Sequence, residues 1–218
     1  MVAAPVAPRP KADLVWDDET DVVVAGSGGG LVGVYTAARE GLSVTVVEAS
    51  DQFGGTTAYS GGGGMWFPCN PVLRRAGSDD TLDAALAYFH AVVGDRTPVE
   101  LQRTYVYRGT DLIAYLESDE RFEFDVLAWP DYFGALPQAR LDGLRHIVMK
   151  PLPAEPLGEL AHQIRGPLDR ERLGAAAPNY LIGGRALVGR LLSAITTYPH
   201  ASLHLDSPLV ELVVTNDG

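Results

Sequence analysis

The stretch DVVVAGSGGGLVGVYTAAREGLSVTVVE, residues 21–48, predicts the fold of this chain. Its opening run, Asp21 to Ala25, is short and apolar and is followed by a turn signal, which is typical of a buried strand. Leu31 to Glu40 has the pattern of a helix that ends at Gly41, and Leu42 to Val47 is a second apolar, β-branched run. Strand, helix and strand in this order predict a parallel βαβ unit with a right-handed crossover.

A glycine loop, Gly26-Ser27-Gly28-Gly29-Gly30, joins the first strand to the helix. Glycines at this place let the backbone turn tightly and approach a pyrophosphate, which the N-terminus of the helix stabilises. Glu48 ends the second strand, beside Ala49, and a carboxylate there accepts hydrogen bonds from ribose hydroxyls. We therefore predict an adenine dinucleotide site that includes the glycine loop, Glu48 and Ala49. The alternative is a merely flexible turn with Glu48 as a solvated strand end.

The spacing of these glycines is irregular. Counted from Gly26, the third position of the G-x-G-x-x-G fingerprint is Leu31, where Gly or Ala is expected for close packing of helix on strand. Counted from Gly28, the fingerprint is complete with Gly30 and Gly33 but begins two residues later. Either the loop is rearranged or its affinity for the cofactor is reduced.

A second glycine-rich segment, Gly54 to Gly62, favours FAD over NAD, because a nicotinamide domain has no need of it. Small residues let backbone pass close to a flavin ring, while threonine and serine donate hydrogen bonds. A glycine-rich surface loop is the alternative. The residues predicted to contact FAD here are Gly54, Gly55, Thr56, Thr57, Ala58, Ser60, Gly61 and Gly62. We expect an α/β fold, a Rossmann-like FAD-binding domain with a parallel sheet and flanking helices.

The rest of the chain predicts further elements of this domain, which we assign to residues 21–218 after a disordered, Pro- and Ala-rich tail at 1–20. Periodicity predicts helices at 81–93, 97–117 and 184–197 and strands at 203–205 and 209–214, and the Pro- and Gly-rich stretch 131–178 predicts functional loops. In the second helix we expect Leu101, Tyr105, Leu112 and Leu116 to face inward. The closing turn signal at 215–218 has no returning strand, so we expect an incomplete domain.

Composition excludes several other classes of protein. The formal charge of −11 argues against a nucleic-acid surface, which needs Lys and Arg patches. The single cysteine, Cys69, excludes an intramolecular disulfide and fits a reducing cytoplasm, and we expect an inert thiol. The five histidines show no metal spacing, so no metal site is expected. The sequence contains no run of about 18 apolar residues, so no membrane span is expected.

Several motifs together resemble the 3-ketosteroid Δ1-dehydrogenases, members of the fumarate reductase/succinate dehydrogenase class of flavoproteins. The motifs are GSGGG, YTAA, VVEASDQFGGTTAYSGGGGMWFP, AWPDYF and LIGGRALVGRLL. FGGTTAYSGG identifies only the wider class, whereas PDYF and IGGRALVGRLL point to the ketosteroid branch. The resemblance implies an FAD domain built from both ends of a chain more than twice this length, with a catalytic domain inserted between them that is absent here.

The family's reaction removes hydrogens from carbons 1 and 2 of a 3-ketosteroid. A tyrosine base takes the proton from carbon 2, flavin N5 takes the hydride from carbon 1, and an external acceptor reoxidises the flavin. The base lies beyond Gly218. The resemblance assigns Tyr132 to the tyrosine that supports this base by hydrogen bonding; from the residues alone, Tyr132 is a buried aromatic anchor of its loop or a lining residue of an apolar pocket. Relative to the family, one residue is missing between Gly30 and Tyr35, which puts tight FAD binding in question.

Some alternatives stay open. Arg185 either touches a cofactor phosphate or is solvated, and we expect Arg190 to be solvated. The second alternative is another flavoprotein of the same class. A member specific for dicarboxylates would need a cluster of Arg and His residues to bind them. The third alternative is a truncated, non-catalytic nucleotide-binding remnant. As a fragment, we expect the chain to be inactive alone.

Overall fold

The computed structural model describes residues 15–166, 173–174 and 179–214. The predicted tail lies mostly outside this part of the chain, and its described residues, 15–20, contain no helix or strand. The predicted turn at 215–218 lies outside it altogether. The elements are β1 (Val22–Ala25), α1 (Leu31–Arg39), β2 (Val44–Val47), α2 (Gly55–Tyr59), β3 (Met65–Trp66), α3 (Pro71–Arg75), α4 (Leu82–Val93), α5 (Val99–Glu117), β4 (Phe124–Val126), β5 (His146–Met149), β6 (Leu152–Pro153), η2 (Glu155–Leu157), α6 (Glu159–His162), β7 (Tyr180–Leu181), α8 (Gly184–Ile195) and β8 (Ala201–His204).

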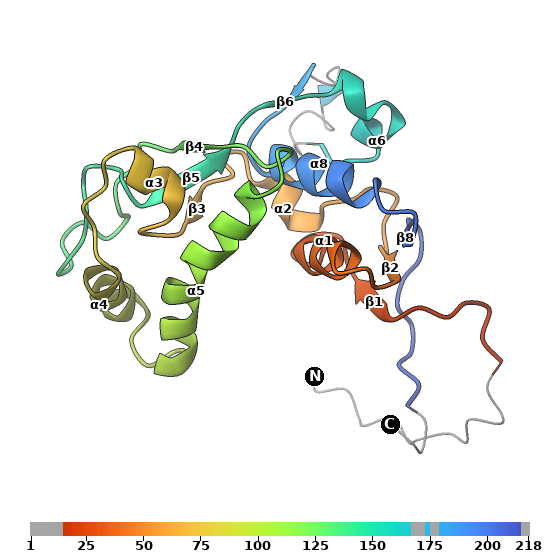
Figure 1. Cartoon of the computed structure of the whole chain (residues 1–218), viewed down its shortest axis with the longest axis horizontal. Coiled ribbons are helices and arrows are strands. Elements are labelled where there is room, and N and C mark those ends of the chain that lie inside the picture. Colours follow the sequence, from red (N-terminus) through yellow and green to blue (C-terminus); the bar gives the residue numbers. More distant parts are fainter. Residues whose placement is uncertain (1–14, 167–172, 175–178, 215–218) are drawn as a thin grey trace.

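A three-stranded parallel sheet has the order β1-β2-β8. Its parallel β1-α1-β2 unit was predicted from the opening stretch, whereas the pairing of β8 with β2 was not. Val22 pairs with Val44, and Val44 pairs with Ala201. Helix α1 packs on β1 and β2 and also against α8, which in turn contacts α2 (Figure 1). The sheet therefore carries the glycine loop at the C-terminal end of β1, where a parallel α/β sheet places ligands.

Helix α1 forms because its apolar residues recur on one face. Leu31, Val34, Tyr35 and Ala38 are buried, and their spacing of three and four residues puts them on a single stripe. The helix ends at Arg39, and Gly41 follows with φ +86°, a conformation that favours glycine. The predicted helix and its C-terminus are confirmed.

The other end of the molecule holds an antiparallel sheet of order β3-β5-β4 together with α3, α4 and α5 (Figure 1). Local capping defines two of these helices. The Asn70 side chain accepts a hydrogen bond from Leu73 N at the start of α3, and the Thr81 side chain accepts one from Ala84 N at the start of α4. Within the described residues, no helix is long and apolar enough to cross a membrane.

Three predictions about the elements are wrong. In α5, Leu101 and Tyr105 are exposed, whereas Gln102 and Val106 are buried, because polar contacts of Gln102 set the face of the first half of the helix. Residues 209–214 form no strand and leave apolar side chains exposed. The stretch 131–178 was predicted as loops, but it contains β5, whose residues His146, Ile147 and Met149 are buried.

Candidate cofactor site and the Tyr132 loop

The glycine loop carries out the three tasks of the dinucleotide fingerprint in a shortened form. Gly26 has φ +91° and makes the tight turn after β1. At Gly28 a Cβ atom would contact Thr57 Oγ1 at 3.5 Å and Gly54 O at 3.6 Å, so glycine keeps the backbone of the loop close to the second glycine-rich segment. At Gly30 a Cβ atom would lie 2.5 Å from both Gly26 O and Val24 Cγ1, so Gly30 allows close packing of helix on strand. The loop is thus G-x-G-x-G.

This geometry corrects both expected registers. Neither Leu31 nor Gly33 is the packing position: Leu31 is a core residue of α1, and a Cβ atom at Gly33 would have no atom within 4 Å. The fingerprint has two residues between its second and third glycines, whereas this chain has only Gly29. The shortening therefore lies before the helix and not between Gly30 and Tyr35, and the phase of α1 is undisturbed.

Glu48 lies at the end of β2 and is buried against two serines. Its Oε2 accepts hydrogen bonds from Ser27 N at 2.9 Å and Ser27 Oγ at 2.5 Å, and its Oε1 accepts from Ser50 N and Oγ at 3.0 Å. Burial alone would raise the pKa of this carboxyl, but the hydrogen bonds outweigh it and lower the pKa to about 2. Glu48 is therefore an ionised acceptor and not a solvated strand end.

The Ser50 hydroxyl has two acceptors but a single hydrogen. Besides Glu48 Oε1, its oxygen lies 2.8 Å from Gln52 O. When this hydroxyl donates to Gln52, one lone pair of the Glu48 carboxylate becomes available to a ribose hydroxyl. Ala49, between the two residues, is exposed.

Ser27 joins the glycine loop to the second glycine-rich segment. Its buried hydroxyl donates to Glu48 and accepts a hydrogen bond from Gly54 N at 2.8 Å. A Cβ atom at Gly55 would lie 3.7 Å from Gly28 Cα, so the two backbones are in contact. The two glycine-rich segments are therefore held against each other.

The segment Gly54 to Gly62, which we call the flavin segment, forms α2 and the turn that follows it. Thr56, Ser60, Gly61 and Gly62 are exposed, whereas Ala58 is buried and belongs to the core. Backbone N–H groups, hydroxyls and positions without side chains line this surface. That donor set fits the pyrophosphate and the flat ring of FAD.

A second glycine pair belongs to this site although its own role was not predicted. Gly183 and Gly184, at the start of α8, pack directly on the flavin segment: Gly184 N donates to Ser60 O at 2.8 Å. A Cβ atom at Gly184 would lie 1.8 Å from Thr57 O, and one at Gly183 would lie 2.4 Å from Gly61 O. The signal was present in the sequence as Gly-Gly before a helix, but its partner could be found only in three dimensions.

The two arginines of α8 are both buried, so the expectation that Arg190 is solvated is wrong. Arg190 donates to Arg121 O at 2.5 Å and to Lys150 O at 3.2 Å. Arg185 Nη2 lies 3.5 Å from Ile164 O, which excludes the solvated alternative for this residue too. These contacts hold the loops around α8 against the helix.

Tyr132 lies on the loop between β4 and β5 and is 75% exposed, so it is not a buried anchor. Its ring lies 6.1 Å from that of Trp129 and 6.2 Å from that of His146. Trp129 in turn reaches the flavin segment, since a Cβ atom at Gly62 would lie 3.6 Å from Trp129 Cζ3. Tyr132 also borders an apolar hollow of about 170 Å³, which is lined by Trp66, Tyr88, Phe89, Val92, Tyr105, Asp131, Tyr132, Phe133 and His146.

Several known proteins are similar to this chain. The family model described as "FAD binding domain" matches residues 21–218. A 3-oxosteroid 1-dehydrogenase of Rhodococcus opacus is 39% identical over 206 residues, which cover 93% of this chain and 39% of that protein. A 4-oxocyclohexanecarboxylate 2-dehydrogenase of Sinomonas cyclohexanicum is 43% identical over 161 residues, 72% of this chain and 26% of that protein. The chain thus spans well under half of the curated relatives.

A solved structure has the same fold. The 3-ketosteroid Δ1-dehydrogenase from Sterolibacterium denitrificans, in complex with 1,4-androstadiene-3,17-dione, superimposes with a TM-score of 0.76 at 25% sequence identity. The match covers 89% of this chain and 41% of that chain.

Proposed function

This chain belongs to the FAD-binding domain family, whose model matches residues 21–218, and we propose that the protein carrying it dehydrogenates 3-ketosteroids between carbons 1 and 2. FAD is the cofactor. The observation that carries the proposal is the position of Tyr132, next to Trp129 and through it next to Gly62 of the flavin segment. The likeness to a 3-oxosteroid 1-dehydrogenase over 93% of the chain supports the same reaction.

The residues of the chain have distinct tasks in this proposal. The N–H groups of the glycine loop and of the start of α1 would hold the pyrophosphate, and Glu48 would accept hydrogen bonds from the ribose. The backbone of Gly54 to Gly62, with Thr56 and Ser60, would contact the flavin ring. When bound, FAD supplies the acceptor for a hydride from the substrate.

Tyr132 is proposed to support the tyrosine base that takes the proton from carbon 2. Its phenol is exposed and therefore free to meet a side chain from another part of the protein. The aromatic hollow beside it offers apolar surface of the kind that a steroid ring packs against.

The test uses the full-length gene product with a 3-ketosteroid and an artificial electron acceptor. We expect FAD to copurify and the product to carry a new carbon 1–carbon 2 double bond, identified by mass and absorbance. Flavin without turnover contradicts the steroid proposal, while colourless protein favours a non-catalytic remnant.

A second candidate is the dehydrogenation of a monocyclic oxo acid. The relative from Sinomonas cyclohexanicum, named 4-oxocyclohexanecarboxylate 2-dehydrogenase, is 43% identical over 161 residues. Both reactions remove hydrogens next to a ring ketone, so the cofactor site does not separate them. Parallel assays with a 3-ketosteroid and with 4-oxocyclohexanecarboxylate decide, by the ratio of the two kcat/KM values.

The proposal includes an external electron acceptor and a cytoplasmic location. The single, buried Cys69 fits a reducing compartment. Fractionation of cells with an antibody against this chain tests the location.

A further inference from the structure

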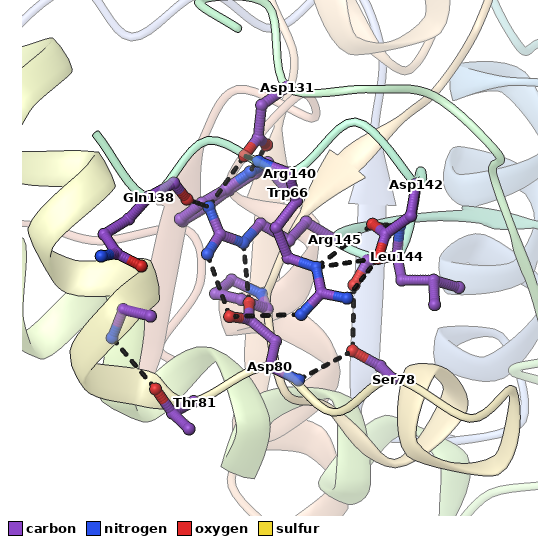
Figure 2. Close-up of polar contacts among 12 residues, drawn as sticks. Trp66, Ser78, Asp80, Thr81, Asp131, Gln138, Arg140, Asp142, Leu144 and Arg145 are labelled. Atoms are coloured by element: carbon purple, nitrogen blue, oxygen red, sulfur yellow. Dashed lines mark hydrogen bonds and ion pairs between the residues drawn. The ribbon is translucent and has the colours of Figure 1, made fainter. Parts of the chain in front are cut away.

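A buried cluster of charges lies directly beneath the Tyr132 loop. Arg145 is 1% exposed and donates from Nε and Nη2 to Asp80 at 2.7 and 3.0 Å (Figure 2). Its Nη1 donates to Asp131 Oδ2 at 2.8 Å. Both carboxylates are buried as well, so the guanidinium is the centre of a three-residue network that is shielded from water.

Asp131 uses the network to fix the backbone just before Tyr132. Its Oδ1 accepts a hydrogen bond from Trp66 Nε1 at 2.8 Å, and its Oδ2 also accepts one from Arg140 N at 2.8 Å (Figure 2). Asp131 N donates to Arg140 O at 2.9 Å, which closes the loop between the two residues. All of these hydrogen bonds are made by Asp131, the residue directly before Tyr132.

The backbone just after Tyr132 is held from the same cluster. Phe133 N donates to the hydroxyl of Tyr88 at 3.3 Å, and the Tyr88 ring lies under the Arg145 guanidinium, 5.3 Å from its Cζ. Tyr132 itself contacts Trp129 and His146 through its ring and stays exposed. Both neighbours of this residue are therefore fixed, while its phenol projects from the surface.

Stability alone does not account for such a cluster. Two carboxylates and a guanidinium lose their hydration on burial, and well-packed apolar residues of similar volume are often as stabilising. What the ions add is directional hydrogen bonding, which sets a backbone to within a fraction of an ångström. We propose that Asp131 and Arg145, with Tyr88, are positioning residues that hold Tyr132 where it supports the tyrosine base; this rests on the function proposed above.

A double-mutant cycle in the full-length, FAD-loaded enzyme tests the proposal. We expect Asp131→Asn to lower kcat on the order of 10- to 100-fold, as a misplaced group does, with KM and FAD content changed less than about twofold. The double variant with Tyr132→Phe loses no more than Tyr132→Phe alone, because both changes disable one group. The proposal is overturned if the kcat losses of the two single variants multiply in the double variant, or if FAD content falls in step with kcat. Asp79→Asn is the control, since this carboxylate pairs with Arg140 from the surface and is 85% exposed.

Tyr88→Phe is the milder variant, because it keeps the ring and removes only the acceptor of Phe133 N. We expect a several-fold loss of kcat with unchanged FAD content. The matched control is Tyr107→Phe, because the Tyr107 hydroxyl donates a hydrogen bond to Asp83 on the surface. Equal kcat in the two variants contradicts the role of Tyr88.

The position of Tyr132 can be read without turnover. In the chain labelled with 3-fluorotyrosine, Tyr132→Phe identifies one fluorine resonance, which we expect Asp131→Asn to shift or broaden and Asp79→Asn to leave in place. An unmoved resonance overturns the positioning role. A moved resonance in a full-length enzyme that turns over no 3-ketosteroid instead rejects the proposed function.

Discussion

At the scale of single residues, Glu48 makes the cofactor site sensitive to acid. Its pKa is about 2 in the folded chain, below the ordinary value of 4.5. The stabilisation is therefore fully present above pH 4.5 and is lost as pH falls towards 2. We expect the midpoint of urea unfolding to fall more steeply over this range in the wild type than in Glu48→Gln. Glu120→Gln, at an exposed position, should keep the wild-type slope; identical slopes in all three contradict the expectation.

Gly30 and Gly33 make a matched pair of residues for testing the shortened glycine loop. A methyl group at Gly30 collides with Gly26 O and Val24 Cγ1, whereas one at Gly33 meets open space on a helix. We expect Gly30→Ala to destabilise by about 1–3 kcal/mol, through overpacking. Gly33→Ala should stabilise by up to about 1 kcal/mol, through higher helix propensity. Urea unfolding of both variants measures the difference, and a tolerated Gly30→Ala refutes our assignment of the packing glycine.

At the scale of elements, Gln102 connects the end of α4 to the start of α5. Its Nε2 donates to Gly94 O at 2.9 Å and to Thr97 O at 2.7 Å, and its Oε1 lies 3.1 Å from His90 Nδ1. We expect Gln102→Ala to cost about 1–3 kcal/mol, because two partly buried carbonyls lose their donor. Leu101→Ala should change the free energy of unfolding by less than about 0.5 kcal/mol, since Leu101 is 59% exposed. The reverse order of the two effects contradicts the observed face of α5.

The elements also show which structure can be predicted from sequence. Periodicity located α1 and α4 closely, because in those helices the apolar residues supply the buried face. It failed in the first half of α5, where the buried side chain is an amide that bonds carbonyls from a preceding turn. Residues 209–214 have the composition of a strand but no pairing partner in the described chain, and a strand needs its partner.

The candidate site divides in the same way. Local sequence was enough to locate the glycine loop, Glu48 and the flavin segment, because each lies next to an element that it ends or begins, but it did not give the register of the glycines in the loop. The packing of Gly183 and Gly184 on that segment, and the pairing of Asp80 with Arg145, join residues that are far apart in the chain. Nothing in their local patterns indicates these partners.

At the scale of the whole molecule, two apolar surfaces should make the isolated chain associate. Val23 on β1, an edge strand of the described parallel sheet, is 61% exposed, and Val210 in the segment after β8 is 90% exposed. We expect light scattering to show oligomers that Val210→Lys reduces without a change in melting temperature. Val15→Lys, at an equally exposed valine outside these surfaces, is the control. A monodisperse wild-type chain contradicts the prediction.

The contact between Gly61–Gly63 and Gly183–Gly184 has a consequence for recombination between relatives. A Cβ atom at Gly63 would collide with the backbone of Gly183, and one at Gly183 would collide with Gly61 O, so each segment restricts the residues allowed at a site more than a hundred positions away. A crossover that imports one segment and keeps a bulkier version of the other should yield insoluble protein, even though both parents fold. Viable crossovers in this domain must therefore transfer the two glycine segments together.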